Sequence, residues 1–414
     1  MYPFRASRLR RTAIVTAGWT VIVASLFIPP TQGGEELMIN GALHIRNPCE
    51  PPGGMESAVL EERWRLGGEE DDVFLGRIAG AVADAQGTIF LLDQGRYQVH
   101  VLSPEGRLLR SMSRQGEGPG EMRQPRDILL MPGGTVGVVD RFPGRIIKLT
   151  PDGTPAGTFR PSPSASTEGG FVAFNEAIHV GGHLVVGRFT SFEDPAAGHQ
   201  TRVASLVGYD LEGHETVTYR SLEVFWEYRN LVVRERDEHW IFWRWAAGPD
   251  GRVAIPADDY RYALSVYNPD GTLDRVIERA YAPMKRSPEI IEELRDSFES
   301  SLERQMPCPV HAIIEKHQRD IISVRLPSDG SIWVLSSRGV RELPPDVLRV
   351  YDVYDTAGHF VKQVALAGPG NPREDRVYFL DDRTLLQVCQ PAGNDEASEM
   401  IICHQLVGAT GVGG

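Results

Sequence analysis

The sequence repeats a pair of glycine-centred turns, and this repeat limits the folds that the chain can adopt. The first turn of each pair precedes a short β-prone run such as Ile89–Leu92, and its glycine stands at Gly87, Gly134, Gly182, Gly251 and Gly330. The second turn of each pair has its glycine at Gly106, Gly153, Gly213, Gly271 and Gly358. Glycine supplies the positive φ that tight hairpin turns need, so each pair predicts two β-hairpins.

The spacing of the repeat indicates a β-propeller. Successive first-turn glycines are 47, 48, 69 and 79 residues apart, and a spacing near 47 fits one four-stranded blade. The two longer spacings predict insertions. A sixth unit keeps the pattern without the glycine, over Tyr378–Leu380, Thr384–Val388 and a final strand at Met400–Cys403.

The ends of the repeat predict how the ring closes. A blade sheet has open edges, so blades must stack radially and the ring must be complete. The segment Val59–Leu66 alternates between apolar and polar residues ahead of the first full unit, and we expect it to form the outer strand of the last blade. We therefore predict an all-β fold, a six-bladed β-propeller over residues 59–408. Five or seven blades are the alternatives.

Two stretches resemble a known family. Arg114–Ile128 is similar to the blade-to-blade connection of NHL-repeat six-bladed propellers of exported bacterial proteins, and Leu92–Val99 resembles the central element of the same repeat. The resemblance is good over residues 71–159, weakens over 160–320 and returns from residue 321. The glycines of the connection lack the Lys-Ser/Thr and the strand-to-helix context of a phosphate-binding loop, so we interpret them as a structural connector.

The repeat is interrupted between its fourth and fifth units. This interruption contains a helix-like stretch, Pro288–Phe298, with Ser287 as its cap and acidic residues in its first turn, as helix starts prefer. We predict a helical insertion over residues 287–318 on the surface of the ring, where binding functions concentrate. A packing appendage held by Cys308 is the alternative.

The first residues have the layout of an export signal. Four arginines precede an uncharged apolar run, Thr12–Ile28, as in a signal peptide or a membrane anchor. We expect residues 1–33 to be cleaved or retained as an anchor, residues 34–58 to form an extended N-terminal segment and residues 409–414 to form a flexible tail. The expected location is the periplasm, the cell surface or the extracellular space. Any membrane contact would then be made by the uncleaved segment alone.

The charge of the chain excludes one class of partner. Its formal net charge is −13, whereas nucleic-acid binding requires a basic face that displaces counterions. We therefore expect no nucleic-acid partner. The expected ligand is a protein, a peptide or a small molecule, and we expect the protein to be a monomer.

Four cysteines in an exported chain predict disulfides rather than catalytic thiols. Cys389 and Cys403 flank a turn-rich stretch, Gln390–Asp395, and we expect them to join two adjacent strands. Cys49 and Cys308 form the second expected pair. Four cysteines allow three connectivities, and the spacing alone does not choose among them.

Aromatic residues gather in one part of the sequence and are the candidate ligand site. Such a cluster can stack on a flat ligand such as a sugar, although propellers also pack large aromatic side chains between their blades. The candidates are Trp226, Tyr228, Trp240, Trp243 and Trp245. The common local signatures of hydrolases, metalloproteases and redox proteins do not occur, so no catalytic or metal-ligating residue is predicted.

These observations favour a non-enzymatic recognition propeller of the cell envelope that binds its ligand through loops on one face. The alternative is a metal-dependent hydrolase or lyase, similar to a lactonase, because related-looking six-bladed propellers hold metal ligands at the channel mouth. One fold hosts many activities, so the fold alone does not choose between them. No cofactor is predicted. A divalent metal in the central channel, held by residues of several blades, stays open as an alternative.

Overall fold

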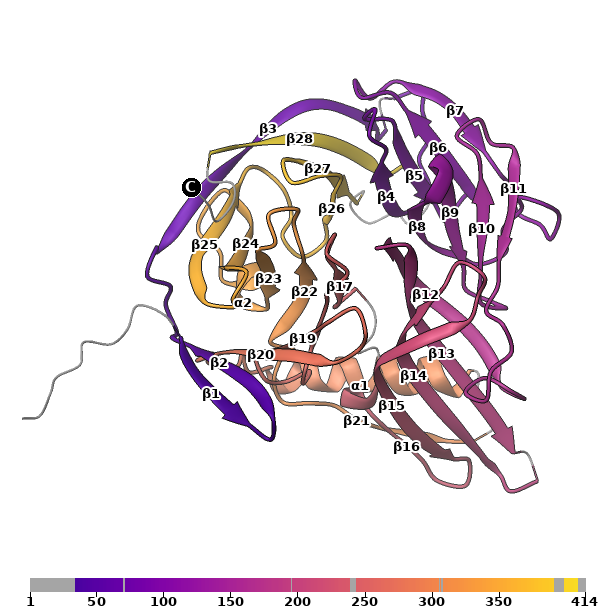
Figure 1. The fold of residues 1–414 in the computed structure, drawn as a ribbon, viewed down its shortest axis with the longest axis vertical. Coiled ribbons are helices and arrows are strands. Elements are labelled where there is room, and N and C mark those ends of the chain that lie inside the picture. The colour runs from indigo at the N-terminus through magenta and orange to yellow at the C-terminus, as the bar shows by residue number, and fades with distance from the viewer. Residues whose placement is uncertain are drawn as a thin grey trace, which may run out of the picture. The chain divides into compact units, whose positions relative to one another are not determined.

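The computed structural model describes residues 34–69, 71–194, 196–238, 243–304, 306, 308–390 and 398–408. The fold consists mostly of β-strands, as the sequence predicted, and its sheets are arranged in a propeller-like way around a common centre (Figure 1). The expected signal or anchor segment, the expected C-terminal tail and most of the turn between Cys389 and Cys403 lie outside the described residues. None of the described helices is both long and apolar enough to span a membrane.

Three consecutive parts of the chain each form a four-stranded antiparallel sheet. Their strands are β4 (Ile78–Ala83), β5 (Ile89–Asp93), β6 (Gln98–Leu102) and β7 (Leu108–Met112); β8 (Pro125–Met131), β9 (Thr135–Asp140), β10 (Arg145–Leu149) and β11 (Pro155–Phe159); and β12 (Phe171–Val180), β13 (His183–Asp194), β14 (His199–Tyr209) and β15 (Glu215–Glu227). The third sheet has the longer strands, with 12 residues in β13 against 6 in β9. These longer strands account for the wider turn spacing in that unit.

The turns that the sequence predicted all lie on one face of the molecule. All ten turn glycines have positive φ, between 75° and 98°. In the first unit, Gly87 lies between β4 and β5 and Gly106 lies between β6 and β7, and a Cβ on Gly87 would be 3.2 Å from Pro104. Because strands in an antiparallel sheet alternate in direction, these turns lie on the same face of the molecule, which we call the turn face. The remaining hairpin and the links between units lie on the opposite connection face.

A fourth sheet is extended by the N-terminal hairpin. It contains β17 (Ala246–Ala247), β18 (Val253–Pro256), β19 (Ala263–Tyr267) and β20 (Leu273–Arg279), followed by β2 (Ala42–Asn47) and β1 (Glu35–Ile39). The β2 strand is parallel to β20. Asn47 fixes this hairpin to the next unit, because its Nδ2 donates to the Gly358 carbonyl at 3.0 Å and its Oδ1 accepts the Phe360 N–H at 2.8 Å.

An eight-stranded sheet joins the end of the chain to its beginning. It contains β22 (Ile321–Arg325), β23 (Ile332–Ser336), β24 (Val347–Tyr354), β25 (Phe360–Ala367), β3 (Met55–Gly67), β28 (Met400–Gly408), β27 (Thr384–Cys389) and β26 (Arg376–Phe379). The β3 strand pairs antiparallel with β28, from Gly67 opposite Met400 to Ala58 opposite Gly408. It thus forms the outer strand beside β28, where the sequence placed it. Its first residues also pair in parallel with β25.

The link from β20 to β22 is the longest on the connection face. It contains α1 (Pro288–Glu303) and β21 (Val310–Ile313). The Ser287 side chain accepts a hydrogen bond from the Ile290 N–H and caps α1, none of whose residues is buried. The β21 strand pairs in parallel with β16 (Leu231–Arg234). The short helices are α2 (Arg338–Arg341) and the 3₁₀ turns η1 (Pro132–Gly134) and η2 (Glu235–Asp237).

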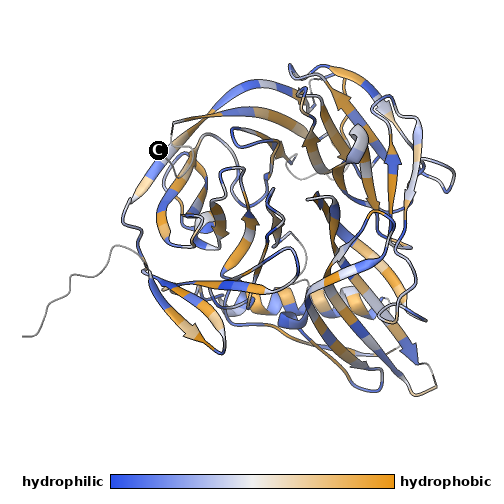
Figure 2. Ribbon diagram, in the orientation of Figure 1, coloured by the Kyte–Doolittle hydropathy of each residue, from blue (hydrophilic) through white to orange (hydrophobic). Residues whose placement is uncertain are grey.

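The core lies between neighbouring sheets. Phe90 of β5 and Val138 of β9 belong to one buried cluster, and Val139 of β9 and Leu184 of β13 belong to the next. Every residue of β5 and of β23 is buried, and Figure 2 shows hydrophobic colour along the strands of the sheets. Each sheet therefore covers the apolar faces of its neighbours, which is why isolated units would expose their cores.

The predicted disulfide between Cys389 and Cys403 is wrong. All four cysteines are free thiols. Cys389 lies opposite Met400, whereas Cys403 lies opposite Leu386. The two cysteines are therefore three residues out of register and on opposite faces of the sheet. At about 3.3 Å per residue, this offset exceeds the Cα separation of roughly 7 Å that a disulfide tolerates.

The predicted disulfide between Cys49 and Cys308 is also absent, because each thiol lies in a separate environment. Cys49 is exposed ahead of β3, and its carbonyl accepts a hydrogen bond from Arg279 at 2.7 Å. Cys308 is half-buried ahead of β21, beside the cluster that contains Trp226. The N-terminal segment is therefore not joined to the insertion by a disulfide.

Candidate functional site at the channel mouth

A central channel with a volume of about 550 Å³ runs between the first strands of the units. The strands that line it are β4, β8, β12, β17, β22 and β26, which lie nearest the middle in Figure 1. Much of the wall is apolar and includes Ala83, Leu129, Ile178, Ala247, Val324 and Phe379. The channel has the size of a small-molecule site.

Two carboxyl groups in the channel wall connect adjacent units. Asp127 accepts the N–H groups of Ile128 at 2.8 Å and of Ala177 at 3.1 Å. Glu176 accepts the N–H of Trp243 through Oε1 at 2.5 Å. Each carboxyl group thus satisfies a backbone donor that belongs to the next unit. This arrangement gives both residues a role in holding the ring together.

The surroundings of these carboxyl groups favour their protonated forms. Burial raises the pKa of Asp127 to about 6. Burial also raises the pKa of Glu176 well above its usual range, and the negative charge of Asp127 raises it further. Part of the Asp127 surface still meets the channel, whereas Glu176 is only 6% exposed. Glu176 therefore keeps its proton well above the pH at which an exposed glutamate loses it.

Three arginines stand at the connection face beside these carboxyl groups, and we call them the arginine group. Arg77 directly precedes β4, Arg126 is the second residue of β8 and Arg141 directly follows β9. Burial lowers the pKa of Arg126, and the positive charges of Arg141 and Arg77 lower it further. Burial also lowers the pKa of Arg141. The positive charges of Arg77 and Arg141 therefore act on Arg126, and Arg126 and Arg141 are half-buried whereas Arg77 is exposed.

No acidic side chain in the described part of the chain forms an ion pair with the arginine group. No ion pair there involves Arg77, Arg126 or Arg141, whereas the neighbouring Arg145 pairs with Asp140 at 2.7 Å. Like charges that lie close together are unfavourable unless an anion approaches them. The arginine group is therefore suited to an anion.

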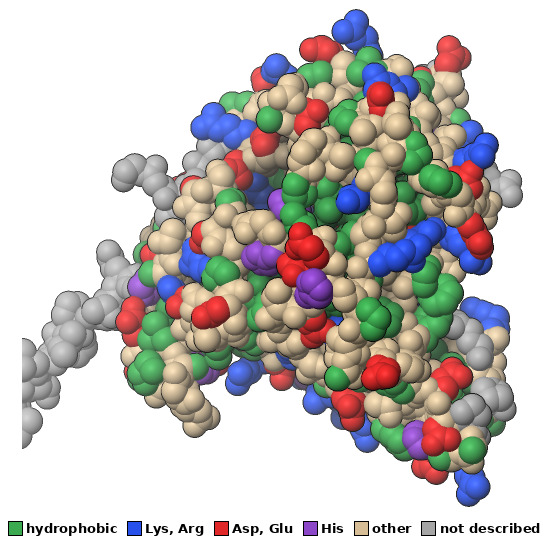
Figure 3. Space-filling model, turned by 45° about the vertical axis from the view of Figure 1, so that its right-hand side comes forward, with side chains coloured by type: hydrophobic (Ala, Val, Ile, Leu, Met, Phe, Trp, Pro, Cys, Tyr) green, Lys and Arg blue, Asp and Glu red, His purple; other side chains and the backbone are tan. Residues whose placement is uncertain are grey.

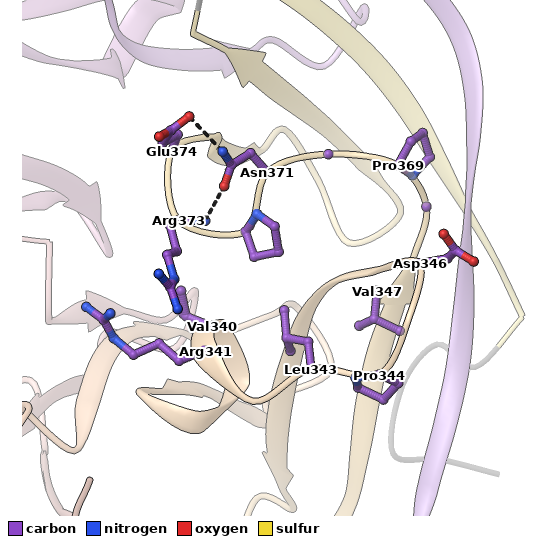
Figure 4. A pocket seen from close by; sticks show the side chains of 13 residues that line it. Val340, Arg341, Leu343, Pro344, Asp346, Val347, Pro369, Asn371, Arg373 and Glu374 are labelled. Atoms are coloured by element: carbon purple, nitrogen blue, oxygen red, sulfur yellow. Dashed lines mark hydrogen bonds between the residues drawn. The ribbon is translucent and has the colours of Figure 1, made fainter. Parts of the chain in front are cut away.

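A second pocket with a volume of about 590 Å³ lies on the same face, between the loop after α2 and the loop from β25 to β26. Figure 4 shows Arg341 and Arg373 near one another at its rim. Asn371 shapes the second loop, because its Oδ1 accepts the Arg373 N–H at 3.1 Å and its Nδ2 donates to Glu374 at 2.6 Å. Burial and the charge of Arg373 lower the pKa of Arg341. Positive charge thus recurs around the connection face.

The predicted aromatic site is divided between two places, and its first part is buried. Trp226, on β15, is 1% exposed and packs in a small cluster with Leu231 and Val310. The Arg202 guanidinium lies 3.7 Å from the centre of the Trp226 ring. Tyr228 follows β15 and is half-buried. These two aromatic residues do not line the channel.

The second part of the predicted aromatic site lies in the channel. Trp243 and Trp245 both line it, with exposed fractions of 56% and 4%. Trp243 has a φ of 51°, which is uncommon for a bulky residue. Trp240 lies outside the described residues. The sequence therefore identified two wall residues of the channel, but it did not separate them from the buried Trp226.

The glycine-rich connection lies between β7 and β8 and is held together by one of its own carboxylates. Glu121 accepts the Gly118 N–H at 2.9 Å and pairs with Arg114 at 2.6 Å.

The arginine group was missed from the sequence. Arg126 and Asp127 stand near the start of β8, and nothing in the local sequence distinguishes them from other charged residues of the connections. Arg77 and Arg141 belong to different links, and only the closed ring brings them to Arg126. No short motif marks such a group.

Candidate metal ligands and the charge of the surface give two further observations. Among the described residues, no three His, Cys, Asp or Glu side chains are grouped in a way that could hold a metal ion. Figure 3 shows one face of the molecule, on which basic and acidic side chains are interspersed over the outer parts. The surface shown is thus mixed in charge, and the arginine group is not an extension of a uniformly basic surface there.

Comparison with known proteins finds similarity in structure alone. No protein-family model matches the chain, and no curated protein matches its sequence. The chain is similar to a member of the DUF4221 family from Bacteroides vulgatus, with 10% identity, a TM-score of 0.48, and coverage of 84% of this chain and 98% of that one. It is also similar to the calcium-binding protein regucalcin from Agrobacterium tumefaciens (12%, 0.39, 85% and 97%) and to a streptogramin B lyase (8%, 0.40, 84% and 97%). At these identities no residue role is carried over.

Proposed function

We propose that this protein is an exported six-bladed, NHL-like propeller of the cell envelope that recognises a small anionic ligand at its channel mouth. The strand order supports six blades, formed by β4–β7, β8–β11, β12–β15, β17–β20, β22–β25, and β26–β28 with β3. In this proposal residues 1–33 direct export and residues 59–408 form the ring. Residues 287–318 are an insertion on the connection face.

The observation that carries the proposal is the arginine group. A chain with a net charge of −13 concentrates Arg77, Arg126 and Arg141 in one place without an ion pair to an acidic side chain in the described part of the molecule. Guanidinium groups hold carboxylate, phosphate and sulfate through paired hydrogen bonds. The nearby Asp127 and Glu176 accept backbone hydrogen bonds, which supports recognition rather than chemistry.

Inorganic sulfate tests this proposal. We expect sulfate, compared with chloride at equal ionic strength, to raise the melting temperature of the protein, because an anion that binds only the folded state stabilises it. The variant Arg126→Gln/Arg141→Gln should lose this increase.

Sulfate also stabilises proteins without specific binding, so a matched control is needed. The variant Arg46→Gln/Arg107→Gln removes the same charge from two exposed arginines that pair with Glu278 and Glu105. It should keep the full sulfate effect. An equal sulfate effect in both double variants would contradict anion recognition by the arginine group.

A further inference from the structure

We propose that the anionic ligand also carries a flat apolar body and that this body enters the central channel. The inference rests on the proposed anion recognition and deepens it to a ligand class, namely an aromatic compound with one carboxylate, sulfate or phosphate group. The arginine group would hold the anionic group, and the channel wall would hold the rings.

The proposed anion position and the channel wall are neighbours along β8. Arg126 directly precedes Asp127, which lines the channel. The Asp127 carboxylate reaches Ala177 on β12, and the adjacent Glu176 holds the backbone of Trp243. A ligand anchored at Arg126 would thus meet the channel wall within one residue along β8.

The channel offers a largely apolar space behind this anchor. Its volume is about 550 Å³, which is enough for a small ring system. The apolar side chains come from separate strands and include Val82, Leu130, Ala246, Leu326 and Val377. Glu176 lies among them, and its raised pKa lets it keep a proton, so it repels an anion less than an ionised carboxylate would. An apolar body gains by leaving water for such a space.

Trp243 supports an aromatic body in particular. It lines the channel with 56% of its surface exposed, although burial of a large aromatic side chain is strongly favoured in the absence of a function. Its φ of 51° is held by the hydrogen bond from its N–H to Glu176. An unusual backbone conformation that keeps a large ring at a pocket wall is typical of binding sites.

A pair of fluorescent probes tests the inference. Anilinonaphthalene sulfonate has a flat apolar body and one anionic group, and phenylnaphthylamine has the same rings without the sulfonate. We expect the full protein to bind the sulfonate probe at least about tenfold more tightly than the neutral probe. The sulfonate probe should displace bound sulfate, because both occupy the arginine group.

Two single variants separate the channel from the rest of the surface. Ser323 is half-buried and lines the channel on β22, whereas the adjacent Ile322 is 36% exposed and does not line it. Ser323→Phe fills the channel and should weaken both probes at least about tenfold without changing the sulfate effect. Ile322→Phe adds a phenyl ring on the same strand and should leave both affinities unchanged. Circular dichroism and melting temperature verify that both variants are folded.

The outcomes distinguish this inference from the proposed function. Probe binding that Ser323→Phe does not weaken would overturn the inference, and a retained sulfate effect would leave anion recognition intact. Loss of the sulfate effect only in Arg126→Gln/Arg141→Gln, together with equal affinities for the two probes, would overturn this inference alone, because the anion and the rings would then bind independently. If the arginine variant changes neither sulfate nor probe binding, both proposals fail. Should Ser323→Phe fail to fold, Trp243→Ala replaces it and should weaken the sulfonate probe in the same way.

Discussion

Closure of the ring by β3 can be tested at two adjacent residues. Leu60 is 7% exposed and belongs to the buried cluster that contains Leu366 and Leu406, whereas its neighbour Val59 is 51% exposed. Both residues are in the same strand, and β3 pairs with β28 around them. Truncation of each side chain to alanine therefore changes the packing at one position and hardly at the other.

The expected magnitudes follow from this difference in burial. Leu60→Ala removes apolar carbons worth about 2 kcal/mol in transfer free energy at about 0.8 kcal/mol per methylene. It also leaves a cavity, so the total cost is about 3 kcal/mol, within the range of roughly 2–5 kcal/mol for buried leucines. Val59→Ala should change the free energy of unfolding by about 0.5 kcal/mol or less, as exposed substitutions do.

Urea unfolding, followed by far-ultraviolet circular dichroism and tryptophan fluorescence, measures both effects. Coincident transitions from the two probes would justify a two-state comparison, and the midpoint shift multiplied by the slope gives the free-energy change. Equal destabilisation by the two variants would refute the reasoning. So would a cost below about 0.5 kcal/mol for Leu60→Ala, since a strand that closes the ring cannot lose a buried leucine at so little cost.

Three further predictions follow from the buried groups and the insertion. The pKa of Asp127 is about 6 in the folded protein and lower in the unfolded chain. Its stabilising effect is therefore complete below about pH 4 and is lost as the pH rises through about 6. The stability of the wild type should fall relative to that of Asp127→Asn over this interval, and parallel pH profiles of the two proteins would contradict this. Burial raises the pKa of Cys389 to about 12 and of Cys403 to about 11, so iodoacetamide at about pH 8 should label exposed Cys49 first. A protein mass lower by the two hydrogens that a disulfide removes would contradict the four free thiols. Replacement of Pro288–Glu303 by a Gly-Ser linker should remove the helical part of the circular-dichroism spectrum and leave the β-sheet part in place, because no residue of α1 is buried. Global unfolding would refute this.

The repeat was readable from the sequence because hairpin turns are local. The ten turn glycines all adopt the positive φ that their positions predicted, and this requirement depends on a few neighbouring residues only. The closing strand was also predictable, since the alternation over Val59–Leu66 marks one buried and one exposed face. The β3 strand also pairs with β25. No local pattern in the sequence predicted this second pairing, because it depends on where another unit ends.

The disulfide prediction failed at the level of strand register. Cys389 and Cys403 stand on neighbouring strands, as expected, but pairing places Cys389 opposite Met400. Register depends on the pairing of both strands with their neighbours, and a shift of one residue moves a side chain to the other face. The residues that flank a turn do not reveal this shift.

The sequence by itself thus determined the β-rich repeat, its turns and its acidic character, because each depends on composition or on contacts over a few residues. Only the tertiary structure decided which charged side chains come near one another. Arg77 precedes β4, Arg126 lies in β8 and Arg141 follows β9, so the three are separated along the chain. Their proximity depends on how the stacked sheets close around a common centre, since radial packing brings together residues that no periodicity connects.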